Sequence, residues 1–267
     1  MSENRSTISY SPSFGYDLAA RRINGEAVSL DLTNWRAAGI GGDMVRADIL
    51  ADFARTMAAA GFDAKAFLPS YGMAEATLAV TICDVDQPLR IDTIDRDFYK
   101  RLGRAIPAAT SPETRSFVVC GAPIPGHDLV IRGDDGRVLG EREIGRIFVK
   151  GPSLMAGYYR DAEATAQVID AEGYLDTGDM GYWLDGEVVI TGRSTDLILR
   201  NGRNIWPQDI EWAAEQVPPL RSGDVAAFAV ESETGEDEVV VLVECRMTEA
   251  SAREALRREV SGVVHYS

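Results

Sequence analysis

The chain has 267 residues, of which 45% are hydrophobic and 26% are charged, and its formal net charge is −15. This composition is typical of a globular protein and argues against extended disorder. The acidic balance and the absence of a long basic run argue against a nucleic-acid partner. They also mean that an anionic ligand would need local cations or a metal ion to approach the surface.

Neither the cysteines nor the histidines form a recognisable catalytic or metal-binding pattern. Cys83, Cys120 and Cys245 are far apart in the sequence and show no CxxC spacing, so they are predicted to be reduced thiols. His127 lies in a turn and His265 lies near the end of the chain. No apolar run approaches the ~20 residues that span a bilayer, and the first residues lack the apolar core of a signal peptide. These features predict a cytoplasmic protein.

The first predicted elements alternate between helix and strand. Apolar residues recur on one side from Asp43 to Ala60, which predicts a helix that ends at Gly61. The segment AFLPSYGMAEATLAV then predicts a short strand, a turn, and a further helix or strand. This alternation indicates an α/β sheet whose ligand lies at the carboxyl ends of its strands.

The middle of the chain changes character twice. Residues 84–116 are more polar and are predicted to be a surface insertion with a short helix from about Asp95 to Gly103. From Phe117 onward the pattern favours strands, in the segments FVVC, DLVIR, RVLG, GRIFVKG and GEVVITGR, separated by glycine-containing turns.

A domain boundary is predicted near residues 193–196. Beyond it, DLILRNGRNIWP predicts a hairpin around an Asn-Gly turn, and a helix is predicted to begin near Pro207. The segments AAFAV and EVVVLVEC predict strands, and a last helix is predicted to begin at Thr248. A unit of roughly 70 residues is small for a self-sufficient core.

Two segments suggest a nucleotide site. Between Gly173 and Glu211, Asp179 and Arg193 each lie at a turn, and an acidic acceptor with a cationic donor suits the two hydroxyls of a ribose. In SYGMAEA, a glycine allows close backbone approach, an aromatic ring offers a stacking face, and Glu75 offers a hard oxygen to Mg²⁺. Alone, SYGMAEA fits equally well as a strand-to-helix turn with Glu75 near the helix start.

Together the two segments resemble the adenylate-forming enzymes, the superfamily of acyl-CoA synthetases and fatty acyl-AMP ligases. The resemblance implies that ATP and Mg²⁺ bind here, with Glu75 as the catalytic residue and the metal ligand. It also implies a set of nucleotide-binding residues: Gly41, Gly42, Tyr71, Gly72, Met73, Ala74, Asp179 and Arg193. In most of the superfamily a threonine precedes the glutamate, whereas Ala74 matches the fatty acyl-AMP ligase branch.

Other segments resemble the same superfamily less specifically. The loop IGGD is similar to the segment that borders adenine, although Asp43 would also serve as an ordinary helix N-cap. Phe14 and Tyr16 lie in a segment similar to one that lines the acyl pocket, although such a pair is more often part of the core. The resemblance places a hinge at Thr195 and Asp196, and it brings Gly202 close to the ligand in a second conformation. Where this chain has Thr195, the superfamily commonly has Asp or Lys.

The resemblance implies an α/β fold in two parts. Residues 1–193 correspond to part of the large AMP-binding domain, with a mixed sheet and a small β-barrel-like region, and residues 194–267 to part of the small α+β domain. Two features of the superfamily are missing from the sequence: the phosphate-binding loop that ends in lysine, and the C-terminal catalytic lysine. We therefore expect little or no activity from the chain alone.

The implied reaction joins a fatty acid to AMP and then transfers the acyl group to an acyl carrier protein. Residues 84–116 stand where fatty acyl-AMP ligases carry an insertion that disfavours transfer to coenzyme A. Two alternatives remain open at this stage. One is a fatty acyl-CoA synthetase, in which CoA is the acceptor, and the other is a non-catalytic nucleotide- or acyl-binding protein or partner subunit.

Overall fold

The computed structural model describes residues 1–23, 29–109, 113–200, 203–231 and 237–265. The chain divides into two compact units, Met1–Ser194 and Thr195–Ser267. Within the described ranges, no helix is both long enough and apolar enough to cross a membrane.

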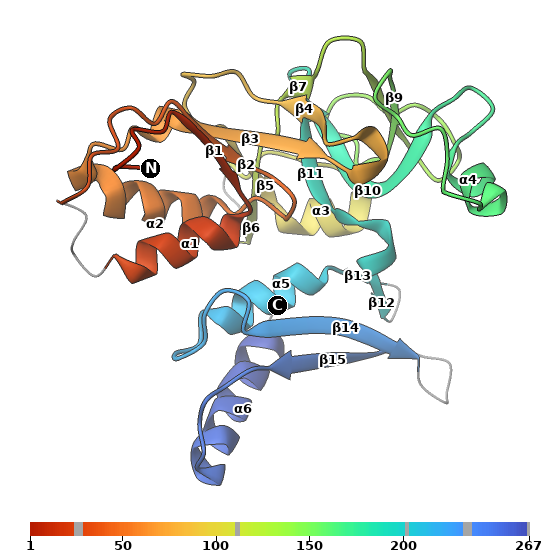
Figure 1. Ribbon diagram of the computed structural model, residues 1–267. Coiled ribbons are helices and arrows are strands. Elements are labelled where there is room, and N and C mark those ends of the chain that lie inside the picture. The colour runs from red at the N-terminus through yellow and green to blue at the C-terminus, as the bar shows by residue number, and fades with distance from the viewer. Residues whose placement is uncertain (24–28, 110–112, 201–202, 232–236, 266–267) are drawn as a thin grey trace. The chain divides into compact units, whose positions relative to one another are not determined.

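The first unit begins with a five-stranded mixed sheet of order β1-β2-β3-β4-β7. Three neighbouring strands run parallel: β1 (Ile8–Ser11), β2 (Ala37–Ile40) and β3 (Phe67–Gly72). Strand β4 (Ala79–Ile82) pairs antiparallel with β3, and β7 (Ala122–Pro123) pairs antiparallel with β4. Helices α1 (Ser13–Arg22) and α2 (Ala47–Met57) lie side by side against one face (Figure 1). Edge-to-face contacts join Phe53 to Tyr16 and to Phe62 at that interface.

Helix α2 confirms the predicted apolar face but corrects its start. Ile49, Leu50, Phe53 and Met57 are buried, because their spacing places them on one side of the helix. The α-helix begins at Ala47 rather than Asp43, continues as the 3₁₀ helix η2 (Ala58–Ala60), and ends at Gly61 in the left-handed conformation.

Asp43 caps a different helix from the one predicted. The N-cap position of α2 is Arg46, whereas the Asp43 carboxylate accepts hydrogen bonds from the Ser13 backbone N–H (2.9 Å) and hydroxyl (3.2 Å). Ser13 is the first residue of α1, whose N-terminal N–H groups have no partner within their own helix. Burial raises the pKa of Asp43 above its ordinary value, although the bonds from Ser13 oppose that shift.

A second sheet in the same unit has four antiparallel strands in the order β11-β10-β9-β8. Its strands are β8 (Asp128–Arg132), β9 (Gly145–Lys150), β10 (Leu175–Leu184) and β11 (Glu187–Arg193). One face contributes Ile131, Ile147, Val149 and Val188 to a buried cluster. The predicted mixed α/β class is confirmed, but the barrel-like region is an open sheet, and the described strands form no closed barrel.

The polar segment after β4 has more structure than the sequence predicted. The short helix is present as α3 (Arg96–Leu102), with Asp95 accepting from two N–H groups at its start and Gly103 in the left-handed conformation at its end. The sequence did not predict that β5 (Ile91–Asp95) pairs with β6 (Thr114–Val118). Nor did it predict the short helices α4 (Ala162–Val168) and η3 (Ala64–Ala66), whereas the short helix η4 (Ala74–Ala76) agrees with the alternative of a helix start near Glu75.

One carboxylate of the insertion makes several contacts with the rest of the first unit. Asp92 on β5 accepts two hydrogen bonds from the Arg142 guanidinium, at 3.0 and 3.2 Å, and a third from the Tyr182 hydroxyl at 2.6 Å. Arg142 also donates to the carbonyl oxygen of Ala105 at 2.7 Å. These charged hydrogen bonds hold β5 at a defined place, because each fixes direction as well as distance.

The second unit begins within η5 (Ser194–Asp196), and its described residues form two antiparallel strand pairs and two α-helices. Strands β12 (Ile198–Arg200) and β13 (Arg203–Ile205) form the first pair, and the predicted Asn-Gly turn between them lies outside the described residues. Helix α5 (Pro207–Glu215) begins at Pro207, as predicted. Strands β14 (Val225–Glu231) and β15 (Asp237–Val243) form the second pair.

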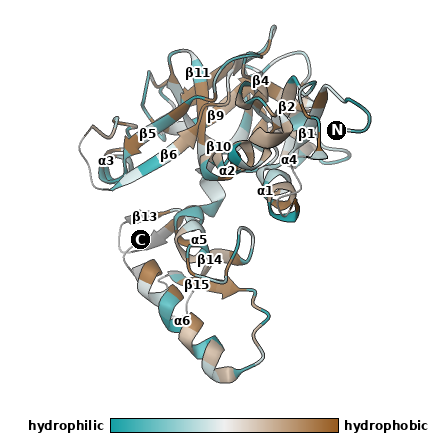
Figure 2. Ribbon diagram, turned by 90° about the vertical axis from the view of Figure 1, so that its left-hand side faces the viewer, coloured by the Kyte–Doolittle hydropathy of each residue, from teal (hydrophilic) through white to brown (hydrophobic). Residues whose placement is uncertain are grey.

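The last helix, α6 (Ala250–His265), begins later than predicted. The carbonyl of Glu249 accepts the N–H of Arg253, so Thr248 lies before the cap position. Hydrophobic and hydrophilic segments alternate along α6 (Figure 2), because one face buries Leu256 and Val260 in the core of this unit.

Candidate functional site

Asp179 and Arg193 are directly paired across the antiparallel strands β10 and β11. Alternating burial along β10 turns Asp179 inward, and the residue is 7% exposed. Its Oδ1 accepts a hydrogen bond from Arg193 Nε at 3.2 Å. Its backbone N–H donates to the Thr177 hydroxyl oxygen at 3.1 Å. The backbone at Asp179 is therefore fixed by a contact within its own strand, and the side chain is held by Arg193 on the neighbouring strand.

Tyr71 brings the first sheet to the same carboxylate. It lies on β3, and its buried hydroxyl donates to Asp179 Oδ2 at 2.7 Å. Burial raises the pKa of Tyr71 well above its ordinary value, and the negative charge of Asp179 adds to the effect. The hydroxyl therefore stays protonated and remains a donor, which fixes the orientation of Asp179.

Arg193 faces outward from this buried group. Its side chain is 64% exposed, whereas that of Asp179 is 10% exposed. The contact with Asp179 uses the Nε–H, which leaves the Nη groups available to donate to a ligand. A fixed carboxylate beside an exposed cationic donor can bind a pair of hydroxyl groups.

Glu75 lies four residues after Tyr71, in the short helix η4. Its Oε1 accepts a hydrogen bond from the Tyr158 hydroxyl at 2.9 Å, and its backbone carbonyl accepts the Met155 N–H at 2.7 Å. Tyr158 follows Gly157 in the segment GPSLMAGYY, in which the sequence predicted no site residue. The aromatic residues directly after a glycine turn were the available signal for this contact.

The described residues contain no group of three or more His, Cys, Asp or Glu side chains that could hold a metal ion by themselves. Glu75 would therefore be one protein ligand rather than part of a cluster of metal ligands, and Tyr158 contacts one of its two carboxylate oxygens. Magnesium in nucleotide enzymes is often bound by one or two carboxylates together with substrate phosphates and water. Glu75 fits such an ion, provided that a phosphate supplies the remaining ligands.

The glycines of the two predicted nucleotide segments are subject to different constraints. A Cβ on Gly72 would lie 1.7 Å from the carbonyl oxygen of Leu78, so the close approach of two backbones requires glycine there. A Cβ on Gly41 would lie 3.0 Å from the carbonyl oxygen of Ser70. Gly42 has a φ of +86° and open space around it. Packing alone therefore accounts for Gly72, independently of any ligand.

The remaining predicted residues lie in varied surroundings. Met73 packs against the cluster beneath the second sheet, and Ala74 is exposed. The Thr195 hydroxyl donates to Asp196 at 3.2 Å, and both residues are exposed. Gly202 lies outside the described residues.

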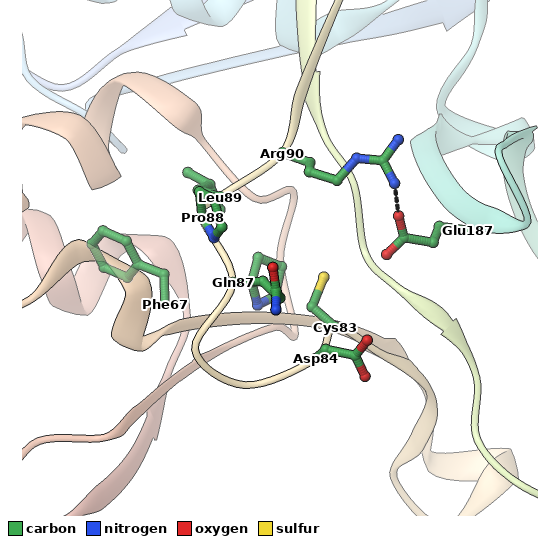
Figure 3. A pocket seen from close by; sticks show the side chains of 9 residues that line it. Phe67, Cys83, Asp84, Gln87, Pro88, Leu89, Arg90 and Glu187 are labelled. Carbon is green, nitrogen blue, oxygen red and sulfur yellow. Dashed lines mark hydrogen bonds and ion pairs between the residues drawn. The ribbon is translucent and has the colours of Figure 1, made fainter.

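The pair expected to line an acyl pocket is divided between surface and core. Phe14 is exposed, whereas Tyr16 is buried and donates its hydroxyl proton to the carbonyl of Gly39 at 2.9 Å. A pocket of about 340 Å³ in the first unit is lined by other residues: Phe67, Pro69, Cys83, Asp84, Gln87, Pro88, Leu89, Arg90 and Glu187 (Figure 3). It contains an ion pair between Arg90 and Glu187 and shares no residue with the predicted nucleotide site.

Comparison with known proteins identifies the family of this chain. The model of the family described as AMP-binding enzyme matches residues 2–159. A protein of Caulobacter vibrioides, provisionally named an acyl-CoA synthetase, is 52% identical over 97% of this chain and 46% of its own length. The medium-chain-fatty-acid–[acyl-carrier-protein] ligase JamA of Moorena producens is 36% identical over 91% of this chain and 43% of its own length.

A solved structure from the fatty acyl-adenylate ligases of E. coli and L. pneumophila has a TM-score of 0.91 and 41% identity. The match covers 98% of this chain and 47% of that one, so this chain spans about half the length of the proteins it matches. It belongs to the AMP-binding, adenylate-forming enzymes, and its relatives include fatty acyl-AMP ligases and acyl-CoA synthetases.

Proposed function

We propose that the native protein containing this chain activates a fatty acid with ATP and transfers the acyl group to the thiol of an acyl carrier protein. The contact of Tyr71 and Arg193 with the Asp179 carboxylate carries this proposal. It provides a fixed acceptor and an exposed donor for the two hydroxyls of a ribose. The sequence similarity to JamA, named as an acyl-carrier-protein ligase, supports the choice of acceptor.

The proposed reaction has two balanced steps. A carboxylate oxygen of the fatty acid attacks the α-phosphorus of ATP, the bond to the bridging oxygen breaks, and pyrophosphate leaves. The thiol sulfur of the acceptor then attacks the acyl carbon, its proton is lost, and AMP leaves. The protein contributes mainly position and charge, because both steps build up charge on oxygens that fixed groups can stabilise.

Each candidate residue has a role in this proposal. Asp179 and Arg193 bind the ribose, and Gly41, Gly42, Tyr71, Gly72, Met73 and Ala74 border the rest of the nucleotide. Glu75 is the proposed catalytic residue through its contact with Mg²⁺, which would neutralise charge on the phosphates when bound. Thr195 and Asp196 form the proposed hinge, which is supported by the division of the chain between Ser194 and Thr195. A cytoplasmic location remains a prediction.

Coenzyme A is the second candidate for the acceptor. The Caulobacter vibrioides protein, at 52% identity, carries the name of an acyl-CoA synthetase. Against this stands the anchored insertion, because Asp92, Arg142 and Tyr182 hold it firmly to the large unit. We infer that a fixed insertion at this place favours the carrier protein over CoA.

Acyl transfer by the native protein tests the proposal. With ATP, Mg²⁺ and a fatty acid, we expect release of pyrophosphate and acylation of a carrier protein, with much slower formation of acyl-CoA. Rapid formation of acyl-CoA would favour the second candidate. Saturable ATP binding with no release of pyrophosphate would instead favour a non-catalytic binding protein.

A further inference from the structure

The turn that carries Glu75 adopts a backbone conformation that non-glycine residues rarely use. Thr77 has φ and ψ of 68° and −54°, and the Leu78 N–H donates to the Ala76 carbonyl at 2.8 Å. A hydrogen bond between residues two apart, at these angles, defines a strained γ-turn. Such strain persists only where surrounding contacts maintain it, and it occurs preferentially at functional sites.

One loop, residues 153–158, supplies contacts to both sides of this turn. The Ser153 hydroxyl donates to the carbonyl of Ala76 at 2.9 Å, and the Ser153 carbonyl accepts from the Thr77 hydroxyl at 3.0 Å. Ala76 thus accepts from Leu78 and Ser153 together, which uses both lone pairs of its oxygen. Ser153 therefore holds the strained turn from the residue before Thr77 and from Thr77 itself.

His127 fixes the orientation of Ser153. Its Nε2 lies 2.7 Å from the Ser153 hydroxyl oxygen. Since the single hydroxyl proton of Ser153 is donated to Ala76, the His127 nitrogen is the donor in this contact. His127 Nδ1 is buried and has no hydrogen-bond partner among the described residues. The arrangement thus requires a proton on His127 Nε2.

The same loop contacts Glu75 directly. Met155 donates its N–H to the Glu75 carbonyl, and the Tyr158 hydroxyl donates to Oε1. Burial accounts for only one side of the strained turn, because Ala76 is buried whereas Leu78, the residue that follows Thr77, is 73% exposed. The feature on which these contacts converge is the direction of the Glu75 carboxylate.

We propose that Ser153 and Tyr158 are positioning residues for Glu75: Ser153 maintains the strained turn, and Tyr158 holds one carboxylate oxygen so that the other is presented to Mg²⁺·ATP. This inference rests on the proposed function. Neither residue is expected to touch the reacting atoms. Their replacement should therefore change the magnesium dependence of the reaction without changing the affinity for the fatty acid.

Magnesium titration of the native protein, with fatty-acid-dependent exchange of pyrophosphate into ATP as readout, tests the role of Tyr158. In Tyr158→Phe we expect the half-saturating Mg²⁺ concentration to rise roughly tenfold, as is typical for loss of a residue that orients a metal ligand. The KM for the fatty acid should stay unchanged. Tyr159→Phe is the matched control, because Tyr159 is the adjacent tyrosine and is 85% exposed.

Ser153→Ala should shift the magnesium dependence in the same direction, and Ser153→Thr should restore it because threonine keeps the hydroxyl. A readout independent of turnover is the NMR signal of ¹³Cζ-labelled Tyr158, assigned by its loss in Tyr158→Phe. Adding Mg²⁺ and ATP should shift this signal in the unaltered protein and leave it unmoved in Glu75→Gln.

The outcomes separate the two proposals. Absence of any exchange in the unaltered protein, at every magnesium concentration, would overturn the proposed function and this inference with it. Normal exchange, combined with the same magnesium dependence in Tyr158→Phe and Tyr159→Phe, would overturn the inference alone. A Tyr158 signal that does not respond to Mg²⁺ and ATP in an active protein would also contradict it.

Discussion

Two carboxylates of the candidate site, Asp179 and Glu75, are held in opposite ways. Asp179 is buried on a regular β-ladder and accepts hydrogen bonds from Tyr71 and Arg193. Glu75 is only partly buried, in a short helix before a strained turn, and a loop distant in sequence holds it. The first is oriented by elements that the fold requires anyway, whereas the second depends on contacts that contribute little buried surface.

This difference suggests a division of tasks. A ribose hydroxyl is a neutral group that needs an acceptor at a constant place, which a rigid strand pair provides. A carboxylate that must accept a hydrated metal ion arriving with its nucleotide needs an open side. We therefore expect substitutions at Asp179 to affect stability and binding together, and substitutions at Glu75 to affect function alone.

The largest effect is expected at Gly72, which lies three residues before Glu75 in the sequence. Gly72→Ala would force a Cβ against the Leu78 carbonyl, so we expect the free energy of unfolding to fall by about 3 kcal/mol. Urea unfolding measures this change. Gly42→Ala is the control, because Gly42 has open space and its substitution carries mainly the cost of a positive φ, about 1 kcal/mol.

The next effect tests the rigid half of the comparison. Asp179→Ala leaves the buried Tyr71 hydroxyl without its acceptor, and we expect a loss of about 2 kcal/mol in the free energy of unfolding. If ribose binds here, Asp179→Asn should also weaken binding of a non-hydrolysable acyl-adenylate analogue by about 30-fold, as expected for a hydrogen bond to a charged group. Calorimetric titration measures the binding, and unchanged affinity would remove Asp179 from the ribose site.

A third carboxylate, Asp43, provides a pH test of how burial acts on such groups. Its pKa is raised by burial, so between the ordinary carboxyl pKa and this raised value the folded state binds more protons than the unfolded state. The free energy of unfolding therefore falls as pH increases through the raised pKa. Asp43→Asn cannot ionise, so its stability relative to the unaltered protein should improve over that pH range. A constant difference between the two proteins would contradict the assignment.

The smallest effect is expected for the stability of Glu75 variants. Glu75→Gln keeps the shape of a partly exposed side chain, and we expect the free energy of unfolding to change by less than about 0.5 kcal/mol. Thermal unfolding, compared with Asp179→Ala under the same conditions, measures the contrast. If Glu75→Gln lowered the free energy of unfolding as much as Asp179→Ala does, the turn at Glu75 would be a structural feature, and the proposed difference between the two carboxylates would be wrong.

Sequence reasoning succeeded where one residue's chemistry or a short period decides the structure. The apolar spacing of Ile49, Leu50 and Phe53 predicts the buried face of α2, and Pro207 predicts the start of α5. It failed for Asp43, which was expected to cap the helix that follows it in the sequence. Asp43 instead accepts a hydrogen bond at the start of α1, because a carboxylate can cap any helix start that the fold brings near it. Sequence reasoning also missed the β5–β6 pairing because α3 separates the two strands in the sequence and because Asp92 on β5 contacts a residue far along the chain.

From the sequence alone the family could be identified and the principal site residues could be proposed, because SYGMAEA and the segment that contains Asp179 and Arg193 are local and specific. Only the tertiary structure decided that Tyr71 meets Asp179 across 108 positions and that Tyr158 meets Glu75 across 83. The physical reason is that a hydrogen bond needs two atoms about 3 Å apart in a defined direction, and only the packing of separate elements brings such atoms together.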